Sequence, residues 1–249
     1  MDLSRSQYYY ESVKDDSAVK EKLQQLAENR PSEGQDKFYW RIRNEGLPWN
    51  HKRIERVYRL LGLNKRQPTR KRIPVRVKET LQVPTKPNET WSMDFMHDSL
   101  SNGRKFRIIN IIDDFNREAL RMEPHFSIGA RKVISELSRV IKERGKPSFI
   151  RVDNGPEFIA EAMKQWCREN EIDLRFIQPG KPTQNAFIER FNRSFRSEIL
   201  DAYCFDNLDQ VRILSDLFME DYNYHRPHES LGNISPKQYH KNVEANGFS

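Results

Sequence analysis

The chain has 249 residues, a formal net charge of +7 and 36% hydrophobic residues. This length holds one large or two modest domains, and the hydrophobic fraction lies above that of disordered chains. No apolar run approaches the length of a membrane-spanning helix and no signal sequence is evident, which excludes an integral helical membrane protein. The positive charge indicates a polyanionic partner. Cys167 and Cys204 form no metal or disulfide pattern, so we expect a cytoplasmic protein.

Three short helices are predicted near the N-terminus, over residues 14–29, 36–45 and 51–61. Asn50 is a favourable N-cap for the third helix and Gly62 is a favourable residue just after its end. The apolar side of this helix faces inward, and its outer side is basic. We therefore predict a small helix-turn-helix-like DNA-binding module over residues 1–63. A small helical bundle with a solvated basic face is the alternative. The predicted DNA contacts of this module are Lys52, Arg53, Arg56 and Arg59.

A basic segment follows this module. Eleven Lys or Arg residues and a single acid, Glu55, lie between His51 and Lys78. Prolines and the loss of helical periodicity predict an extended linker over residues 64–88. Its basic side chains are expected to lie along the phosphate groups of DNA. The linker residues expected to contact DNA are Arg70, Lys71 and Arg72.

The second half of the chain alternates between strand and helix patterns. Strands are predicted at about 91–97, 106–113, 118–124, 148–153 and 173–177, and helices at about 129–143, 156–169 and 207–222. Three antiparallel strands followed by β-α alternation predict an α+β (α/β) fold, a mixed sheet flanked by helices. We expect this second domain to span residues 89–225 and a C-terminal tail to span residues 226–249.

The stretch from Lys181 to Leu200 is predicted to be one helix with two different faces. An apolar stripe forms one face, made of Phe187, Ile188, Phe191, Phe195 and Ile199. The other face carries one carboxylate, two amides and two guanidinium groups, which share a side at helical spacing. These polar residues are Asn185, Glu189, Asn192, Arg193 and Arg196.

Three acidic residues lie in or beside these elements. Asp94 is near the middle of the first strand of this domain, Asp153 ends a later strand, and Glu189 lies on the helix. Thirty-five residues separate Asp153 from Glu189. Three carboxylates that converge in the fold can hold a hard divalent cation, and oxygen ligands favour Mg²⁺ or Mn²⁺. Asp113 and Asp114 are rival carboxylates at a strand end, where acids usually form turns.

Three segments, each containing one of these three acids, together resemble the DDE transposase and retroviral integrase superfamily. The segments Trp-Ser-Met-Asp, Val-Asp-Asn-Gly-Pro-Glu-Phe and Gln-Asn-Ala-Phe-Ile-Glu-Arg-Phe-Asn occur in this order. They resemble the second-frame (ORF B) protein of a bacterial insertion-sequence transposase. The resemblance implies a ribonuclease H-like fold in which Asp94, Asp153 and Glu189 are the catalytic and metal-binding residues. It also implies two Mg²⁺ ions in each active site, with Mn²⁺ as a substitute.

The resemblance implies DNA cleavage that frees a 3′-OH, followed by strand transfer that integrates the element into target DNA. Element ends and target DNA are the expected partners, bound by a homo-oligomer near the nucleoid. The expected association also includes fusion to, or assembly with, an upstream-frame helix-turn-helix protein. The DNA contacts expected near the metals are Asn154, Asn185, Asn192, Arg193 and Arg196. A catalytically idle DNA-binding regulator and a plain ribonuclease H-like nuclease are the alternatives.

Overall fold

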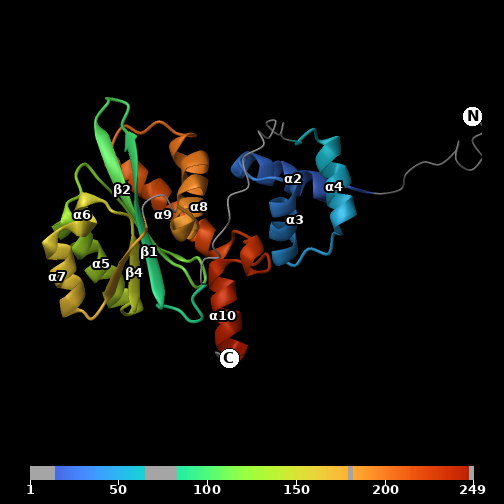
Figure 1. The fold of residues 1–249 in the computed structure, drawn as a ribbon. Helices are drawn as coiled ribbons and strands as arrows, with labels where there is room; N and C mark the ends of the chain where they lie inside the picture. The colour runs from blue at the N-terminus through green and yellow to red at the C-terminus, as the bar shows by residue number, and fades with distance from the viewer. Residues whose placement is uncertain (1–14, 65–82, 179–181, 247–249) are drawn as a thin grey trace, which may run out of the picture. The chain divides into compact units, whose positions relative to one another are not determined.

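A computed structural model of the chain describes residues 15–64, 83–178 and 182–246. The chain divides into two compact units, Met1–Thr69 and Arg70–Ser249. This division falls inside the segment predicted to be a linker. Figure 1 shows both units, and each is described by itself below.

The N-terminal unit contains three helices: α2 (Ser17–Asn29), α3 (Gln35–Asn44) and α4 (His51–Leu60). Apolar side chains from all three form one buried cluster. The predicted cap of α4 is present, since the Asn50 side chain accepts a hydrogen bond from the backbone N–H of Arg53 at 2.8 Å. Gly62 follows the helix end with a φ of 68°, a conformation that glycine adopts without steric penalty.

The C-terminal unit is built on a five-stranded mixed sheet with the order β3-β2-β1-β4-β5. Its strands are β1 (Thr90–Ser99), β2 (Lys105–Asp113), β3 (Ala119–His125), β4 (Phe149–Val152) and β5 (Asp173–Phe176). The first three strands pair antiparallel, and β4 and β5 join parallel to β1. The antiparallel strands follow each other directly, whereas helices connect the parallel ones.

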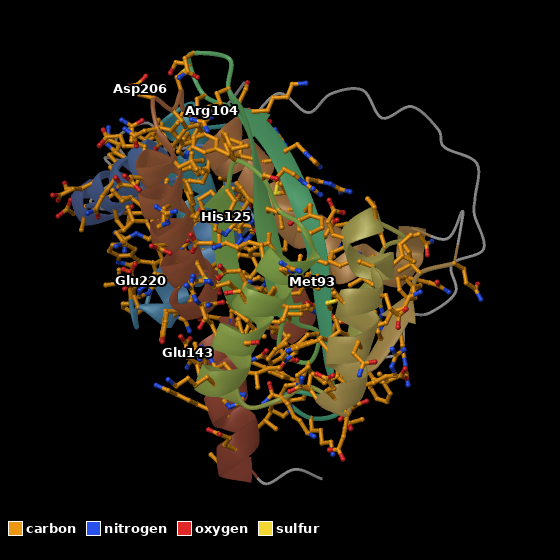
Figure 2. All side chains as sticks on the ribbon, turned by 90° about the vertical axis from the view of Figure 1, so that its left-hand side faces the viewer. Met93, Arg104, His125, Glu143, Asp206 and Glu220 are labelled. Atoms are coloured by element: carbon orange, nitrogen blue, oxygen red, sulfur yellow. The ribbon has the colours of Figure 1, made fainter. Side chains whose placement is uncertain are left out.

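Helices cover both faces of this sheet. On one face, α5 (Ala130–Arg144), α6 (Pro156–Ile159) and α7 (Glu161–Glu169) pack on β1, β2 and β4. On the other face, α8 (Ala186–Phe195) and α9 (Leu208–Tyr224) pack on β1, β2 and β3. Figure 2 shows Met93 of β1 among the packed side chains, with Glu143 and Glu220 on the outside of α5 and α9. The predicted α+β fold is therefore confirmed.

Two predicted helices are interrupted in the structure. The helix predicted over residues 156–169 breaks at Ala160, which has an extended conformation with a ψ of 137°. Phe158 and Met163 are both buried in the same core, although a spacing of five places them on different sides of a continuous helix. The break allows both side chains to reach that core.

The predicted helix over residues 181–200 is also divided. A 3₁₀ turn, Pro182–Asn185, precedes α8, and a π turn, Arg196–Leu200, follows it. The predicted apolar stripe is buried or half-buried against the sheet. Leu200 is buried five residues after Phe195, and a π turn places residues five apart on one side.

The segment predicted as a C-terminal tail packs within the same unit. Arg226 is buried and forms two hydrogen bonds of 2.7 Å with the carboxylate of Glu198 in the π turn. A 3₁₀ turn, Glu229–Leu231, and helix α10 (Pro236–Asn246) follow. The buried Arg226–Glu198 pair shows that packing continues past the predicted boundary at residue 225. Among the residues whose placement is described, no helix is long and apolar enough to cross a membrane.

Candidate active site

Neighbouring parallel strands place Asp94 and Asp153 at the same level of the sheet. Ser92 of β1 pairs with Arg151 of β4, and each aspartate lies two residues further along its strand direction. Glu189 lies on α8, which packs against β1 on the face that Asp94 also faces. Three segments that are distant in the sequence thus bring their acids to one part of the fold. We call these three acids the Asp94 cluster.

The carboxyl group of Asp94 lies in a strongly perturbed environment. Its pKa is raised from 3.8 to about 6, chiefly by burial and also by the negative charges of Asp153 and Glu189. The backbone N–H of Phe95 and the side-chain amide of Asn192 oppose this shift. Nearby like charges disfavour ionisation, so Asp153 and Glu189 both act on the Asp94 carboxyl group.

Among the described residues, the hydrogen bonds to the Asp94 carboxylate come from amide groups. Its Oδ1 accepts a hydrogen bond from the Phe95 backbone N–H at 2.8 Å. Its Oδ2 accepts a hydrogen bond from Nδ2 of Asn192 at 2.8 Å. Oδ1 of Asn192 in turn accepts from Nδ2 of Asn110 at 2.7 Å. Each carboxylate oxygen keeps further lone pairs available.

The loop after β4 fixes the orientation of Asp153. The Gly155 backbone N–H donates to Oδ1 of Asp153 at 2.9 Å. A Cβ atom on Gly155 would lie 2.9 Å from that same oxygen, so a larger residue here would force the carboxylate to shift. Nδ2 of Asn154 donates to the carbonyl of Ile177, just after β5, at 3.1 Å. The Asn154 amide therefore ties this loop to the neighbouring strand.

The donor chemistry of the Asp94 cluster fits a hard divalent cation, because all its side-chain donors are carboxylate oxygens. Across the described residues, no three His, Cys, Asp or Glu side chains stand close enough together to hold a metal ion as they are oriented. Metal binding at the cluster would therefore require rotation of carboxylate side chains. Asp94 and Asp153 each retain free lone pairs for this role.

The rival acids Asp113, which ends β2, and Asp114, which begins the turn to β3, are both buried. Oδ2 and Oδ1 of Asp113 accept backbone hydrogen bonds from Asn88 and Phe115 at 2.8 and 2.9 Å. Asp114 forms an ion pair with Arg151 at 2.7 Å. We call residues 113–118 the buried turn. Its contacts match the turn-forming interpretation of these two acids.

Two features near the site were not predicted from the sequence: the amide of Asn110, and the contact of Arg107 with the Phe95 ring. Asn110, which reaches Asp94 through Asn192, lies in the middle of an apolar strand, and that isolated polar residue was an available signal. Arg107 of β2 forms an ion pair with Glu157 beside the Asp153 loop, and its guanidinium lies 4.3 Å above the Phe95 ring. Nothing in the sequence pattern joins these residues, since strand pairing and loop packing bring them together.

The polar face predicted on α8 divides in the structure. Arg193 is exposed, as expected of a DNA contact. Asn185 and Asn192 are buried, with 3% and 9% of their surfaces exposed. Arg196 donates to Asp98 at 2.9 Å and to the carbonyl of His97 at 2.6 Å. Asn192 thus turns inward to Asp94 and Arg196 has protein partners, and contact between this face and DNA stays a prediction.

The basic residues predicted on α4 are also partly paired within the N-terminal unit. Asp16 forms ion pairs with Arg53 at 3.0 Å and with Arg56 at 2.6 Å. Arg59 pairs with Glu55 one turn away. Lys52 is exposed and lines an open surface pocket together with Asn50, Asp15 and the two paired arginines. The predicted linker contacts Arg70, Lys71 and Arg72 lie outside the described residues.

Comparisons with known proteins agree with this architecture. Two models described as "Integrase core domain" match residues 84–182 and 170–236. An uncharacterized 31.7 kDa protein of insertion element IS407 from Burkholderia multivorans is 40% identical over 240 residues, covering 95% of this chain and 86% of the relative. The putative transposase InsK of element IS150 from Escherichia coli K12 is 24% identical, covering 96% and 90%.

One solved structure has the same fold. It is the simian T-cell lymphotropic virus intasome in complex with a phosphatase regulatory subunit, with a TM-score of 0.53 and 18% identity. The match covers 87% of this chain and 73% of that chain. The fold and the family matches define an integrase-core protein. The chain belongs to the transposase family of bacterial insertion elements, as its motifs predicted, and this family acts in DNA transposition.

Proposed function

We propose that this protein is a metal-dependent DDE transposase that cleaves DNA strands and joins the resulting 3′-OH ends to target DNA. The observation that carries the proposal is the Asp94 cluster. Asp94, Asp153 and Glu189 come from two strands and one helix, and the latter two raise the pKa of Asp94. Burying a carboxylate near other carboxylates without a cationic partner disfavours the folded state. Such an arrangement is typical of a functional site.

In this proposal the Asp94 cluster holds two Mg²⁺ ions, with Mn²⁺ as a substitute. When bound, these ions supply charge stabilisation for the entering and leaving oxygens of a phosphodiester displacement. Asp94, Asp153 and Glu189 would hold these ions through their carboxylate oxygens. The amide of Asn192 and the backbone N–H groups of Phe95 and Gly155 orient the aspartates.

The reaction has two displacements in this proposal. Water first attacks a phosphodiester at the element end and releases a 3′-OH. That hydroxyl then attacks a target phosphodiester, so one P–O bond forms as another breaks. A covalent protein–DNA intermediate is not required.

DNA contacts belong to the proposal as well. Arg193 is exposed on α8 near Glu189, and Lys52 is exposed on α4. Cationic side chains of this kind neutralise phosphate charges and displace counterions. We include the predicted linker contacts here, together with a homo-oligomer that assembles on DNA in the cytoplasm. Assembly with an upstream-frame helix-turn-helix protein is a further part of the proposal.

A strand-transfer assay with end-labelled element DNA tests the function directly. Purified protein is incubated with labelled ends, a target plasmid and Mg²⁺ or Mn²⁺. A joined product supports the transposase, and cleavage without joining would instead indicate a plain nuclease. A mobility shift without either product would indicate an idle DNA-binding regulator. The Asp94→Asn and Asp153→Asn variants are the controls for contaminating nucleases.

A further inference from the structure

Asn110 is a fully buried polar residue at the centre of β2, within a run of isoleucines. The antiparallel register places it directly opposite Asp94 of β1. A buried amide is unfavourable unless it is hydrogen-bonded. Asn110 makes one side-chain bond, from its Nδ2 to Oδ1 of Asn192 at 2.7 Å. Its own Oδ1 is buried without a hydrogen-bond partner in the described structure.

The direction of these hydrogen bonds follows from the charge of Asp94. An ionised carboxylate only accepts hydrogen bonds, so Asn192 must turn its Nδ2 toward Oδ2 of Asp94, 2.8 Å away. Oδ1 of Asn192 then needs a donor on its other side. Asn110 supplies that donor and leaves its own carbonyl oxygen unpaired. An unpaired buried oxygen lowers the stability of the fold, so packing alone does not explain an asparagine at this position.

We propose that Asn110 is a positioning residue that acts on Asp94 through Asn192. Asn110 fixes the amide orientation of Asn192. Asn192 then occupies one lone pair of Asp94 Oδ2 and directs the remaining lone pairs toward the metal ions. This inference rests on the proposed function, in which Asp94 is a metal ligand. Asn110 contacts neither DNA nor metal in this scheme, and its effect passes through two hydrogen bonds.

The Asn110→Asp variant tests this inference with little change in shape. In its ionised form the new carboxylate has no donor for Asn192, so it accepts from Nδ2 of Asn192 and turns the carbonyl oxygen of that amide toward Asp94. Mn²⁺ affinity is measured on DNA-free protein by electron paramagnetic resonance. We expect a Mn²⁺ affinity about 10–100-fold weaker than in the native protein, as for other residues that orient metal ligands.

Asn223→Asp is the matched control. Asn223 of α9 is also buried, and its amide bonds to the backbone N–H and carbonyl of Ala119, both at 2.8 Å. The same amide-to-acid change there should lower the melting temperature and leave the Mn²⁺ affinity within about twofold of the native value, because distant sites act independently. Asn110→Ala removes the donor and is expected to weaken Mn²⁺ binding in the same direction. If Asn110→Asp does not fold, the alanine variant decides the question by the same measurement.

Native Mn²⁺ affinity in both Asn110 variants would overturn the inference, because Asn110 would then be only structural. Asp94→Asn separates this failure from a failure of the proposed function. If Asp94→Asn binds Mn²⁺ as tightly as the native protein, Asp94 is not a ligand and the proposed function itself is wrong. If Asp94→Asn loses binding while the Asn110 variants retain it, only the positioning role is wrong.

Discussion

The Asp94 cluster and the buried turn are two groups of acids in the same unit, half-buried in the first and buried in the second, and they differ in their partners. Burial raises the pKa of Asp94, Asp113 and Asp114 to about 6 in every case. In the buried turn, Asp114 pairs with Arg151, and Glu118 pairs with Arg144 and Lys237. Asp94 instead accepts hydrogen bonds from two neutral amides.

This difference shows that a perturbed pKa alone does not identify a functional carboxylate. Asp114 and Glu118 are compensated by arginine and lysine, so they contribute to the fold and a metal ion would have to displace those partners. Asp113 lies beside these pairs, and backbone N–H groups occupy both of its oxygens. Asp94 faces Asp153 and Glu189 and can accept a cation without breaking an ion pair. The following predictions test this distinction.

The largest contrast is expected between Asp153→Asn and Asp113→Asn. Loss of a metal ligand removes several kcal/mol of transition-state stabilisation, which corresponds to a roughly 1,000-fold or greater loss of cleavage and joining. Asp113→Asn should retain activity. Thermal melting with and without Mn²⁺ accompanies the cleavage assay. Asp153→Asn should also be more stable than the native protein without metal, and Mn²⁺ should raise its melting temperature less. If Asp113→Asn is the variant that loses its Mn²⁺ response, the site has been assigned to the wrong acids.

Breaking an ion pair of the buried turn should lower the free energy of unfolding more than breaking an exposed ion pair. Arg151→Met leaves the fully buried Asp114 without its cation, and removing one partner of a buried pair lowers the free energy of unfolding by about 3–5 kcal/mol. Urea denaturation measures this change. Arg168→Met is the matched control, because Arg168 pairs with Glu161 on the exposed side of α7, where such pairs contribute roughly 1 kcal/mol or less. Equal losses in the two variants would contradict the structural role of the turn.

Gly155→Ala should disturb the Asp153 carboxylate directly. The added Cβ lies 2.9 Å from Oδ1 of Asp153, so the carboxylate must move. Misplacing a catalytic group by about 1 Å lowers the rate by roughly 100-fold. Gly129→Ala is the control, because its Cβ would meet no atom within 4 Å. Single-turnover cleavage rates compare the two. A native rate in Gly155→Ala would mean that the loop tolerates the extra methyl group.

Without metal, the carboxyl groups of Asp94 and Asp113 should make the free energy of unfolding depend on pH in the same way. A carboxyl whose pKa rises from 3.8 to about 6 on folding stabilises the native state fully below pH about 4, and this stabilisation is lost as the pH rises through 6. Asp94→Asn and Asp113→Asn should therefore each gain stability relative to the native protein between pH 4 and 7, by roughly 2 kcal/mol.

Urea titrations at several pH values measure these gains, with the exposed Asp201→Asn as the control. Of these two variants, only Asp94→Asn should both gain stability and lose the rise in melting temperature that Mn²⁺ causes. A pH-independent difference in stability would contradict the assigned cause, which is burial of an ionisable group.

The smallest effect concerns the two arginines of the α8 region. Arg193→Ala should weaken DNA binding and flatten the slope of log affinity against log salt concentration by about 0.9, the value for one phosphate contact. Its stability should stay within roughly 0.5 kcal/mol of the native value, as for most surface changes. Arg196→Ala should instead lower stability by up to about 1 kcal/mol, because it loses its contacts with Asp98 and His97. Fluorescence anisotropy and melting curves distinguish the two.

The sequence was sufficient for the sheet and the covering helices, because their patterns are local. Strand alternation, caps and the apolar stripe of α8 each depend on residues a few positions apart. The inward orientation of Asn192 was partly visible too. It lies four residues after Ile188 and three before Phe195, both buried, and so it borders the apolar stripe.

The remaining features depend on contacts between distant residues. Arg196 meets Asp98, and Asn192 meets Asp94, across 98 residues in each case. Asn110 lies in a strand whose pattern is apolar, and only its register with Asp94 gives it a role. Such pairings follow from the packing of helices on the sheet, which the sequence pattern alone does not specify.

The covering of one sheet face by α8 and α9 also sets when the site can form during synthesis. The strands leave the ribosome first, and the helix that carries Glu189 and Asn192 follows them. Until then the apolar side chains on that face, among them Ile108 and Met122, have no cover, and exposed surface of this kind promotes aggregation. A chain that stops before α8 has the strand aspartates but lacks Glu189 and the donor for Asp94. Under the proposed function, incomplete synthesis therefore yields no protein able to cut DNA.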